Sequence, residues 1–252
     1  WHFTILLFQC LLSTLIAVVL TSLPPSPWRI IGQGAMLCFI CPTATAAVVV
    51  ARRLGGDMAS VTTYTILVNL LAALVLPVLL PWVSDGTDEG FLRDFLRIAC
   101  HTFPILVMPM VVTVVLRLWA PRTVEVLAGL SELPFYLWAV SLSLAIAVTT
   151  RSIVHSHQAL AFTLGLALVS LLACIVQFAV GHRMGADEGD IVSATQSCGQ
   201  KNTVFIIWVG YTFLSPITSL AGGFYSIWHN VYNSYQLYRK SKDDDAAQDT
   251  GK

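Results

Sequence analysis

The sequence predicts an all-α polytopic membrane protein. Of its 252 residues, 56% are hydrophobic and only 11% are charged, and the mean hydropathy is +0.74. A soluble domain carries about 25% charged residues. The apolar residues fall into runs of about 20 residues, which is the length that a helix needs to cross a bilayer core. Short polar connectors separate these runs, so we expect several membrane-spanning helices.

Eight apolar runs are candidate membrane spans. They cover approximately residues 3–22, 30–51, 58–83, 98–119, 127–150, 158–181, 190–212 and 216–238. Together they form one predicted membrane transport domain over residues 1–238. The segment 239–252, RKSKDDDAAQDTGK, is polar and mixed in charge. Such a composition is typical of disorder, so we expect a disordered cytoplasmic tail there.

The distribution of positive charges predicts the orientation in the membrane. With a cytoplasmic C-terminus and alternating spans, nine Lys and Arg residues fall inside and four fall outside. Cytoplasmic loops carry the excess of such residues, so we expect a multi-pass protein of the cell membrane with its C-terminus in the cytoplasm. The inside set is Arg52, Arg53, Arg117, Arg122, Arg183, Arg239, Lys240, Lys242 and Lys252, and the outside set is Arg29, Arg93, Arg97 and Arg151.

Composition and motifs argue against several classes of function. The formal net charge of zero is unlike that of a nucleic-acid-binding protein. The six cysteines show no Cys/His spacing of a zinc site. The sequence contains no Ser/His/Asp order, glycine-rich phosphate loop or HExxH motif. We therefore expect no enzyme activity, no cofactor and no metal.

Two of the spans are interrupted near their middle. In the second span, Pro42 removes a backbone donor and disfavours helix at Cys41. In the seventh, Gly199 lies in the polar stretch SATQSCGQKN. Freed backbone groups at membrane depth occur where they are buried in protein or line a cavity. Interruptions in corresponding spans of two halves therefore predict a transport site, although Pro42 taken alone is also compatible with a simple kink.

Lys201 places a positive charge within the seventh span, and no carboxylate neighbours it in the sequence. An unpaired charge at mid-membrane costs at least a few kcal/mol, so it indicates a function. An anionic substrate would complete its neutralisation. The alternative is a lysine that extends to the membrane interface. The polar side chains expected to solvate the ammonium are Gln9, Thr43, Thr45, Gln200 and Asn202.

Three motifs occur in order along the chain: CPTATAAVVVARR, SCGQKN and, in the last span, SIWHN. In this order they resemble the bile acid:sodium symporter family, in which the corresponding stretches are C-P-G-G-T-A-S-N-V, E-V-G-M-Q-N and a similar closing helix. Gln9 resembles the glutamine of the family's third helix. The matching positions in the first two motifs are Cys41, Pro42, Thr45, Ala46, Gly199 and Asn202.

The resemblance implies a fold of two inverted five-helix repeats with two broken helices that cross. On this comparison about eight of the ten family helices are present. The sequence begins at Trp1 without an initiator methionine, so we interpret it as truncated at its N-terminus.

The resemblance also implies ion-binding positions, at which this sequence departs from the family. Ala47 and Val48 replace a serine and an asparagine, and Ser197 replaces a glutamate shared by two sodium sites. Alkyl side chains cannot coordinate a hard cation that prefers oxygen. Lys201 replaces a sodium-binding glutamine, so its ammonium can stand in for a bound cation. The expected ion-coupling set is Lys201, Ser197, Gln9 and Thr65.

The function implied is secondary transport of a small or amphipathic organic anion without sodium. Lys201 would act as a fixed cation or as a proton carrier, and the sequence does not separate proton coupling from exchange or uniport. Two alternatives stay open: a sodium-coupled organic anion or bile acid symporter with a relocated ion site, and a non-transporting membrane sensor or scaffold. We interpret His229 as a packing or hydrogen-bonding residue near a helix end, with a proton relay as the alternative. The expected substrate-binding set is Thr43, Thr45, Gln200, Lys201 and Asn202.

Overall fold

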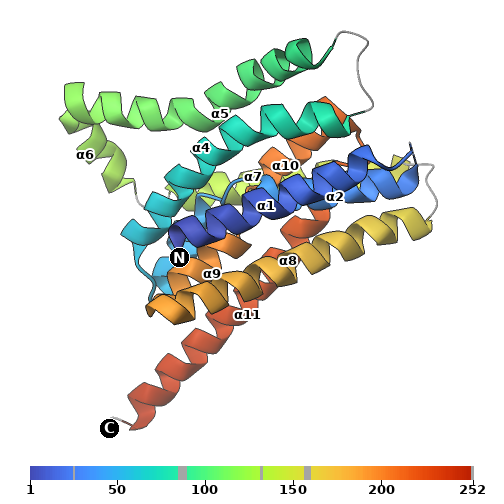
Figure 1. The fold of residues 1–252 in the computed structure, drawn as a ribbon. Helices are drawn as coiled ribbons and strands as arrows, with labels where there is room; N and C mark the ends of the chain where they lie inside the picture. Colours follow the sequence, from blue (N-terminus) through green and yellow to red (C-terminus); the bar gives the residue numbers. More distant parts are fainter. Residues whose placement is uncertain (25, 85–89, 131–132, 156–159, 251–252) are drawn as a thin grey trace.

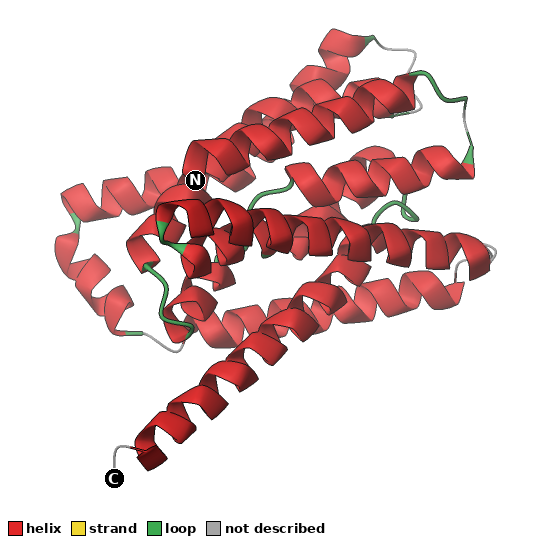
Figure 2. Ribbon diagram, turned by 60° about the horizontal axis from the view of Figure 1, so that its bottom comes forward, coloured by secondary structure: helices red, strands yellow, loops and turns green. Residues whose placement is uncertain are grey.

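The computed structural model describes residues 1–24, 26–84, 90–130, 133–155 and 160–250, and the regular elements of these residues are helices (Figures 1 and 2). This confirms the all-α prediction. The elements are α1 (His2–Thr21), α2 (Pro27–Ile40), α3 (Ala46–Arg53), α4 (Met58–Val83), α5 (Phe91–Trp119), α6 (Pro121–Gly129), α7 (Leu133–His155), α8 (Leu160–Glu188), α9 (Ile191–Gly199), α10 (Thr203–Val209), the π-helical turn η1 (Gly210–Leu214) and α11 (Leu220–Thr250).

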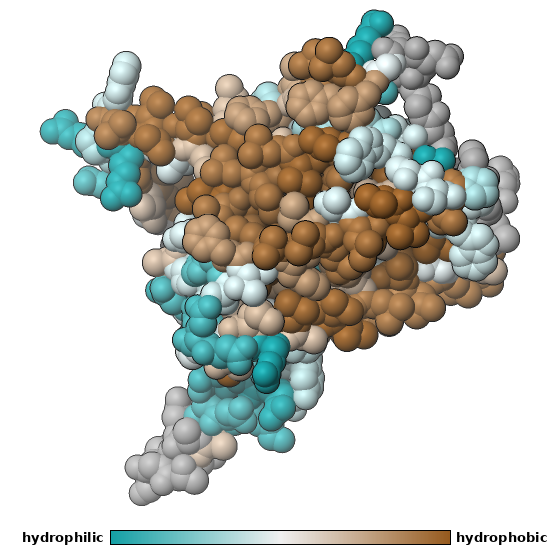
Figure 3. All heavy atoms as spheres, in the orientation of Figure 1, coloured by the Kyte–Doolittle hydropathy of each residue, from teal (hydrophilic) through white to brown (hydrophobic). Residues whose placement is uncertain are grey.

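Four of the described helices, α1, α4, α5 and α8, are each long and apolar enough to cross a membrane. Their outward faces carry large apolar side chains such as Leu11, Leu15 and Leu118, which are exposed. Figure 3 shows apolar surface across the middle of the molecule, with more polar surface towards its ends. Exposed apolar surface of this extent is unfavourable in water, and a lipid bilayer would cover it.

The helices run between two ends of the molecule. At one end, termed the basic end, Arg52 and Arg53 close α3, Arg117 lies in the last turn of α5, and Arg183 lies near the end of α8. Figure 1 shows this end on the left, where the N-terminus and α6 lie. At the opposite end, the Gln33 side-chain amide donates to the Val83 carbonyl at 2.6 Å.

The second and seventh predicted spans are each broken into two helices, as predicted. Between α2 and α3 the chain is unwound over residues 41–45, and between α9 and α10 it is unwound over residues 200–202. The two unwound segments run antiparallel, with the Asn202 N–H donating to the Pro42 carbonyl at 2.8 Å and the Ala44 N–H donating to the Gln200 carbonyl at 3.1 Å. This pair of segments is termed the crossing.

Glycines allow α8 to approach α9 closely and so support the second broken helix. A Cβ atom at Gly181 would lie 2.6 Å from the Ala194 carbonyl oxygen and 2.8 Å from the Thr195 Cα. One turn further, a Cβ atom at Gly185 would lie 2.6 Å from the Asp190 carbonyl oxygen. Small residues at such spacing are typical of close helix packing in membranes.

Two segments differ from the predicted boundaries. The predicted span 127–150 begins inside α6, which ends at Gly129, and the longer helix α7 begins at Leu133. The segment 239–250, expected to be disordered, continues α11 as helix to Thr250. An ion pair of 2.7 Å between Lys240 and Asp244, four residues apart, supports this helical extension.

We predict that Gly181→Ala lowers the stability of the protein. The added methyl group meets backbone atoms of α9 that have no room to move, and overpacking of this kind costs about 1–3 kcal/mol. Gly129→Ala is the matched control, since a Cβ atom there has no neighbour within 4 Å. Thermal unfolding in detergent measures both variants. Equal unfolding midpoints for the two would contradict the close packing of α8 on α9.

Candidate functional site

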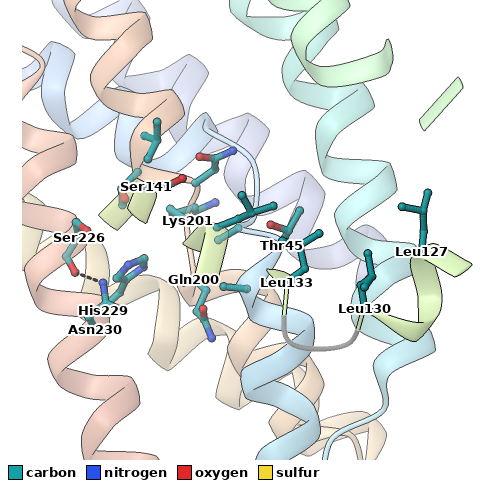
Figure 4. A pocket seen from close by; sticks show the side chains of 16 residues that line it. Thr45, Leu127, Leu130, Leu133, Ser141, Gln200, Lys201, Ser226, His229 and Asn230 are labelled. Carbon is teal, nitrogen blue, oxygen red and sulfur yellow. Dashed lines mark hydrogen bonds between the residues drawn. The ribbon is translucent and has the colours of Figure 1, made fainter. Parts of the chain in front are cut away.

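A cavity of about 560 Å³ lies beside the crossing (Figure 4). Its volume is in the range of small-molecule sites in proteins. One wall is polar and the other is apolar. The polar wall comprises Thr45, Gln200, Lys201, Asn202 and Thr203 of the broken helices, Ser226, His229 and Asn230 of α11, and Ser141 of α7, and the apolar wall comprises Leu127, Leu130, Leu133 and Leu137.

The first turns of two helices face this cavity. Thr45 and Ala46 at the start of α3 line it, and so do Asn202 and Thr203 at the start of α10. The Asn202 Oδ1 accepts a hydrogen bond of 3.1 Å from the N–H of Phe205 and so caps α10. Helix N-termini carry partial positive charge and unpaired N–H groups, so the N-terminal turn of α3 adds positive potential to this wall.

Lys201 caps the C-terminal end of α2. Its Nζ donates to the Phe39 carbonyl at 3.2 Å, in the last turn of that helix. A cation is favourable at a helix C-terminus, where unpaired carbonyls carry partial negative charge. In the same turn, the Gln177 side-chain amide donates to the Cys38 carbonyl at 3.1 Å. Side chains therefore satisfy carbonyls that the break in this helix has freed.

The C-terminal end of α9 is capped in the same way. The Thr43 hydroxyl donates to the Ser197 carbonyl at 2.6 Å, and the Tyr225 hydroxyl donates to the Gly199 carbonyl at 2.8 Å. The crossing thus has two chemically different sides. Helix N-termini face the cavity, whereas the capped C-termini face the protein interior.

Lys201 lies next to the cavity, and its ion pairing can be followed among the described residues. The residue lines the cavity wall, although none of its side chain is exposed to solvent. Its titratable neighbours are the thiols Cys38, Cys41 and Cys198. Within the described part of the chain no Asp or Glu forms an ion pair with it. Among the described residues, the ammonium has the Phe39 carbonyl as a hydrogen-bond partner, and no described carboxylate neutralises its charge.

Gln9 belongs to a buried hydrogen-bond network that joins four helices. The Tyr64 hydroxyl of α4 donates to the Gln9 Oε1 at 3.0 Å, and the Gln9 Nε2 donates to the Gln177 Oε1 of α8 at 3.3 Å. The Gln177 Nε2 donates in turn to the Tyr225 hydroxyl of α11 at 2.9 Å. All four residues have no exposed surface. This network positions the donors that cap the crossing.

Sequence reasoning did not identify Tyr64, Gln177 or Tyr225 as site residues. A signal for Gln177 was present, since an amide within the apolar stretch LLACIVQFAV is costly unless it has partners. The tyrosines carry no such signal, because an aromatic residue in a membrane helix is ordinarily a packing residue.

The structure places most of the predicted substrate-binding residues along the cavity and gives the predicted ion-coupling residues different surroundings. Four residues of the predicted substrate-binding set line the cavity, whereas the Thr43 hydroxyl donates to the Ser197 carbonyl at the end of α9. Ser197 is fully buried and Gln9 is bonded within its network. The Thr65 hydroxyl donates to Val61 in its own helix at 2.8 Å. Among the described residues, no group of three or more His, Cys, Asp and Glu side chains could hold a metal ion.

Comparison with known proteins places the chain among transporters. The model of the SBF-like CPA transporter family matches residues 1–237, which include the crossing, the cavity and the buried network. This agrees with the resemblance to bile acid:sodium symporters found in the motifs. No curated protein matches the sequence. The extent of the family match shows that this chain, a multi-pass membrane protein, belongs to the SBF-like CPA transporter family.

Proposed function

We propose that the protein is a secondary transporter of a small or amphipathic organic anion, that it works without sodium, and that Lys201 supplies the positive charge at the crossing, as a fixed cation or as a proton carrier. Membership of a transporter family supports transport across a membrane. The observation that supports an anionic substrate and independence from sodium is the buried Lys201 ammonium, which donates to the Phe39 carbonyl and belongs to a residue that lines the cavity.

An anionic substrate suits the electrostatics of the cavity. The ammonium of Lys201 and the N-terminal turn of α3 both contribute positive potential to the polar wall. None of the described residues that line the cavity is Asp or Glu. The four leucines of the facing wall suit an apolar or amphipathic body. A carboxylate or similar group would therefore bind towards the crossing, with its apolar part against the leucines.

Independence from sodium is supported by the hydrogen bonding of the crossing. Protein donors already occupy the freed carbonyls of Phe39, Ser197 and Gly199. Sodium would compete with these donors for the carbonyl oxygens, and the side chains of Ala47 and Val48 offer it no oxygen. A sodium-coupled mechanism would therefore need an ion site elsewhere in the protein.

Uptake of an organic anion into proteoliposomes should proceed equally well in sodium and choline buffers at fixed pH. The reason is that the positive charge at the crossing is covalently attached as Lys201. Initial rates of uptake over a series of sodium concentrations test this. A steep, saturable rise with sodium would establish the sodium-coupled alternative.

Substitution of Lys201 tests the fixed charge. Lys201→Met keeps most of the length and removes the ammonium, so the affinity for an anion should fall by about 30-fold or more, which corresponds to loss of a desolvated charge contact of roughly 2–5 kcal/mol. Lys201→Arg keeps the charge and does not readily release a proton. An exchanger should retain transport in this variant, whereas a proton-coupled carrier should bind substrate and lose accumulation driven by a pH gradient.

Tyr225→Phe is the matched control, because it removes a neutral donor from the Gly199 carbonyl in the same crossing. It should lower thermal stability by about 1 kcal/mol and leave the net charge at the crossing unchanged. If Lys201→Met bound the anion like the parent protein, the fixed-cation proposal would be wrong.

We propose that the basic end faces the cytoplasm, as the excess of positive charge indicates. A reporter fused after Lys252 should then be cytoplasmic, and a cysteine introduced at Ser84 should react with an impermeant reagent added to intact cells. Ser84 follows α4 at the end opposite to the basic end. The reverse result at both positions would invert the orientation.

A further inference from the structure

A polar stripe runs along one face of α11. Its members are Ser226, His229, Asn233 and Gln236, and their spacings of three, four and three residues place them on the same side of a helix. Ser226 and His229 line the cavity beside Lys201. From there the stripe leads along α11 towards the basic end (Figure 1).

Three successive members of this stripe have buried polar atoms without a hydrogen-bond partner among the described residues. The atoms are the Ser226 Oγ, the His229 Nδ1 and the Asn233 Oδ1, in residues that are 1%, 4% and 5% exposed. Each unsatisfied buried polar group costs about 1–3 kcal/mol. Such groups in proteins are ordinarily satisfied by ordered water when no side chain reaches them.

A second series of polar groups runs alongside the stripe. The Gln200 side-chain amide, which lines the cavity, donates to the Gln196 Oε1, and the Gln196 Nε2 donates to the Gln236 Oε1 at 2.6 Å. The two series thus begin at the same cavity wall and meet at Gln236. Gln236 is half-buried, so this point lies at the edge of the packed interior.

We propose that the α11 stripe is a hydrated pathway that carries protons between Lys201 and the basic end. This inference rests on the proposed function in one respect, which is that Lys201 is the group that exchanges the proton. The Lys201 ammonium gives one proton to a neighbouring water, and each water or side chain of the path accepts one proton and releases another. One proton leaves at the basic end and a neutral amine remains, and the reverse sequence restores the ammonium.

The groups along the path have the chemistry that this transfer needs. Hydroxyl and imidazole groups both donate and accept hydrogen bonds, and amide groups orient the water between them. The titratable groups that face Lys201 are Cys38 and Cys41 of the α2 end and Cys198 of α9. The ring of Tyr225 lies edge-on to His229 with centroids 5.6 Å apart. None of these groups is a carboxylate that would hold the proton in the path.

Access of water to Asn233 is the first test. Asn233→Cys should react with an impermeant charged thiol reagent at least about tenfold faster than Val231→Cys, because this reaction requires a hydrated thiolate. Val231 is exposed on the surface of α11 away from the stripe, at nearly the same height along the helix. The parent protein supplies the background from its own six cysteines. Equal rates for the two variants would overturn the hydrated pathway, whether or not the protein transports an anion.

Proton movement is the second test. Asn233→Leu keeps the number and branching of the side-chain heavy atoms and removes the polar group outside the cavity, so proton flux should fall several-fold while anion binding at fixed pH stays unchanged. A pH-sensitive dye inside proteoliposomes measures the flux during anion uptake. A parent protein that transports an anion with no proton flux, or an Asn233→Leu variant with full flux, would refute the pathway. Unchanged anion binding in Lys201→Met would contradict the proposed function alone, so the two failures are distinguishable.

Discussion

The antiparallel pairing of the two unwound segments is the interaction on which the rest of the site depends. Breaking a helix within a membrane frees backbone donors and acceptors that lipid cannot satisfy. Here the two breaks satisfy each other, through the bonds from Asn202 to Pro42 and from Ala44 to Gln200. The pairing also fixes the direction of four helix ends. Two N-termini face the cavity and two C-termini face the interior.

This division of helix ends explains why a lysine is stable at the crossing. The interior side concentrates carbonyl groups, and the Lys201 ammonium is bonded to one of them. Neutral side chains satisfy the other freed carbonyls: Thr43, Gln177 and Tyr225 donate to the carbonyls of Ser197, Cys38 and Gly199, respectively. A second cation is therefore not needed to satisfy them. On the cavity side, the N-terminal turn of α3 contributes positive potential. The same arrangement stabilises the lysine and places it at the wall of the cavity.

The network of Gln9, Tyr64, Gln177 and Tyr225 connects the crossing to the surrounding helices. Each of its members lies on a different helix, and each bond within it is fully buried. Buried networks of this kind are stable only when every member has its partners. The polar stripe on α11 differs in this respect, since three of its atoms have no described partner. The network holds the crossing in place, whereas the stripe has hydrogen-bonding capacity left for water.

The helical class and the positions of the two breaks are predictable from the sequence, because Pro42, Gly199 and the apolar runs act through local backbone chemistry and helix length. The sequence also identified Lys201, since a charge in an apolar run is costly wherever the chain folds. The carbonyl that the ammonium caps, the side chains that bond to Gln9 and the leucines that face the cavity depend on how the helices pack. Phe39 and Lys201 are 162 residues apart, and helix packing, which local sequence does not encode, brings such partners together.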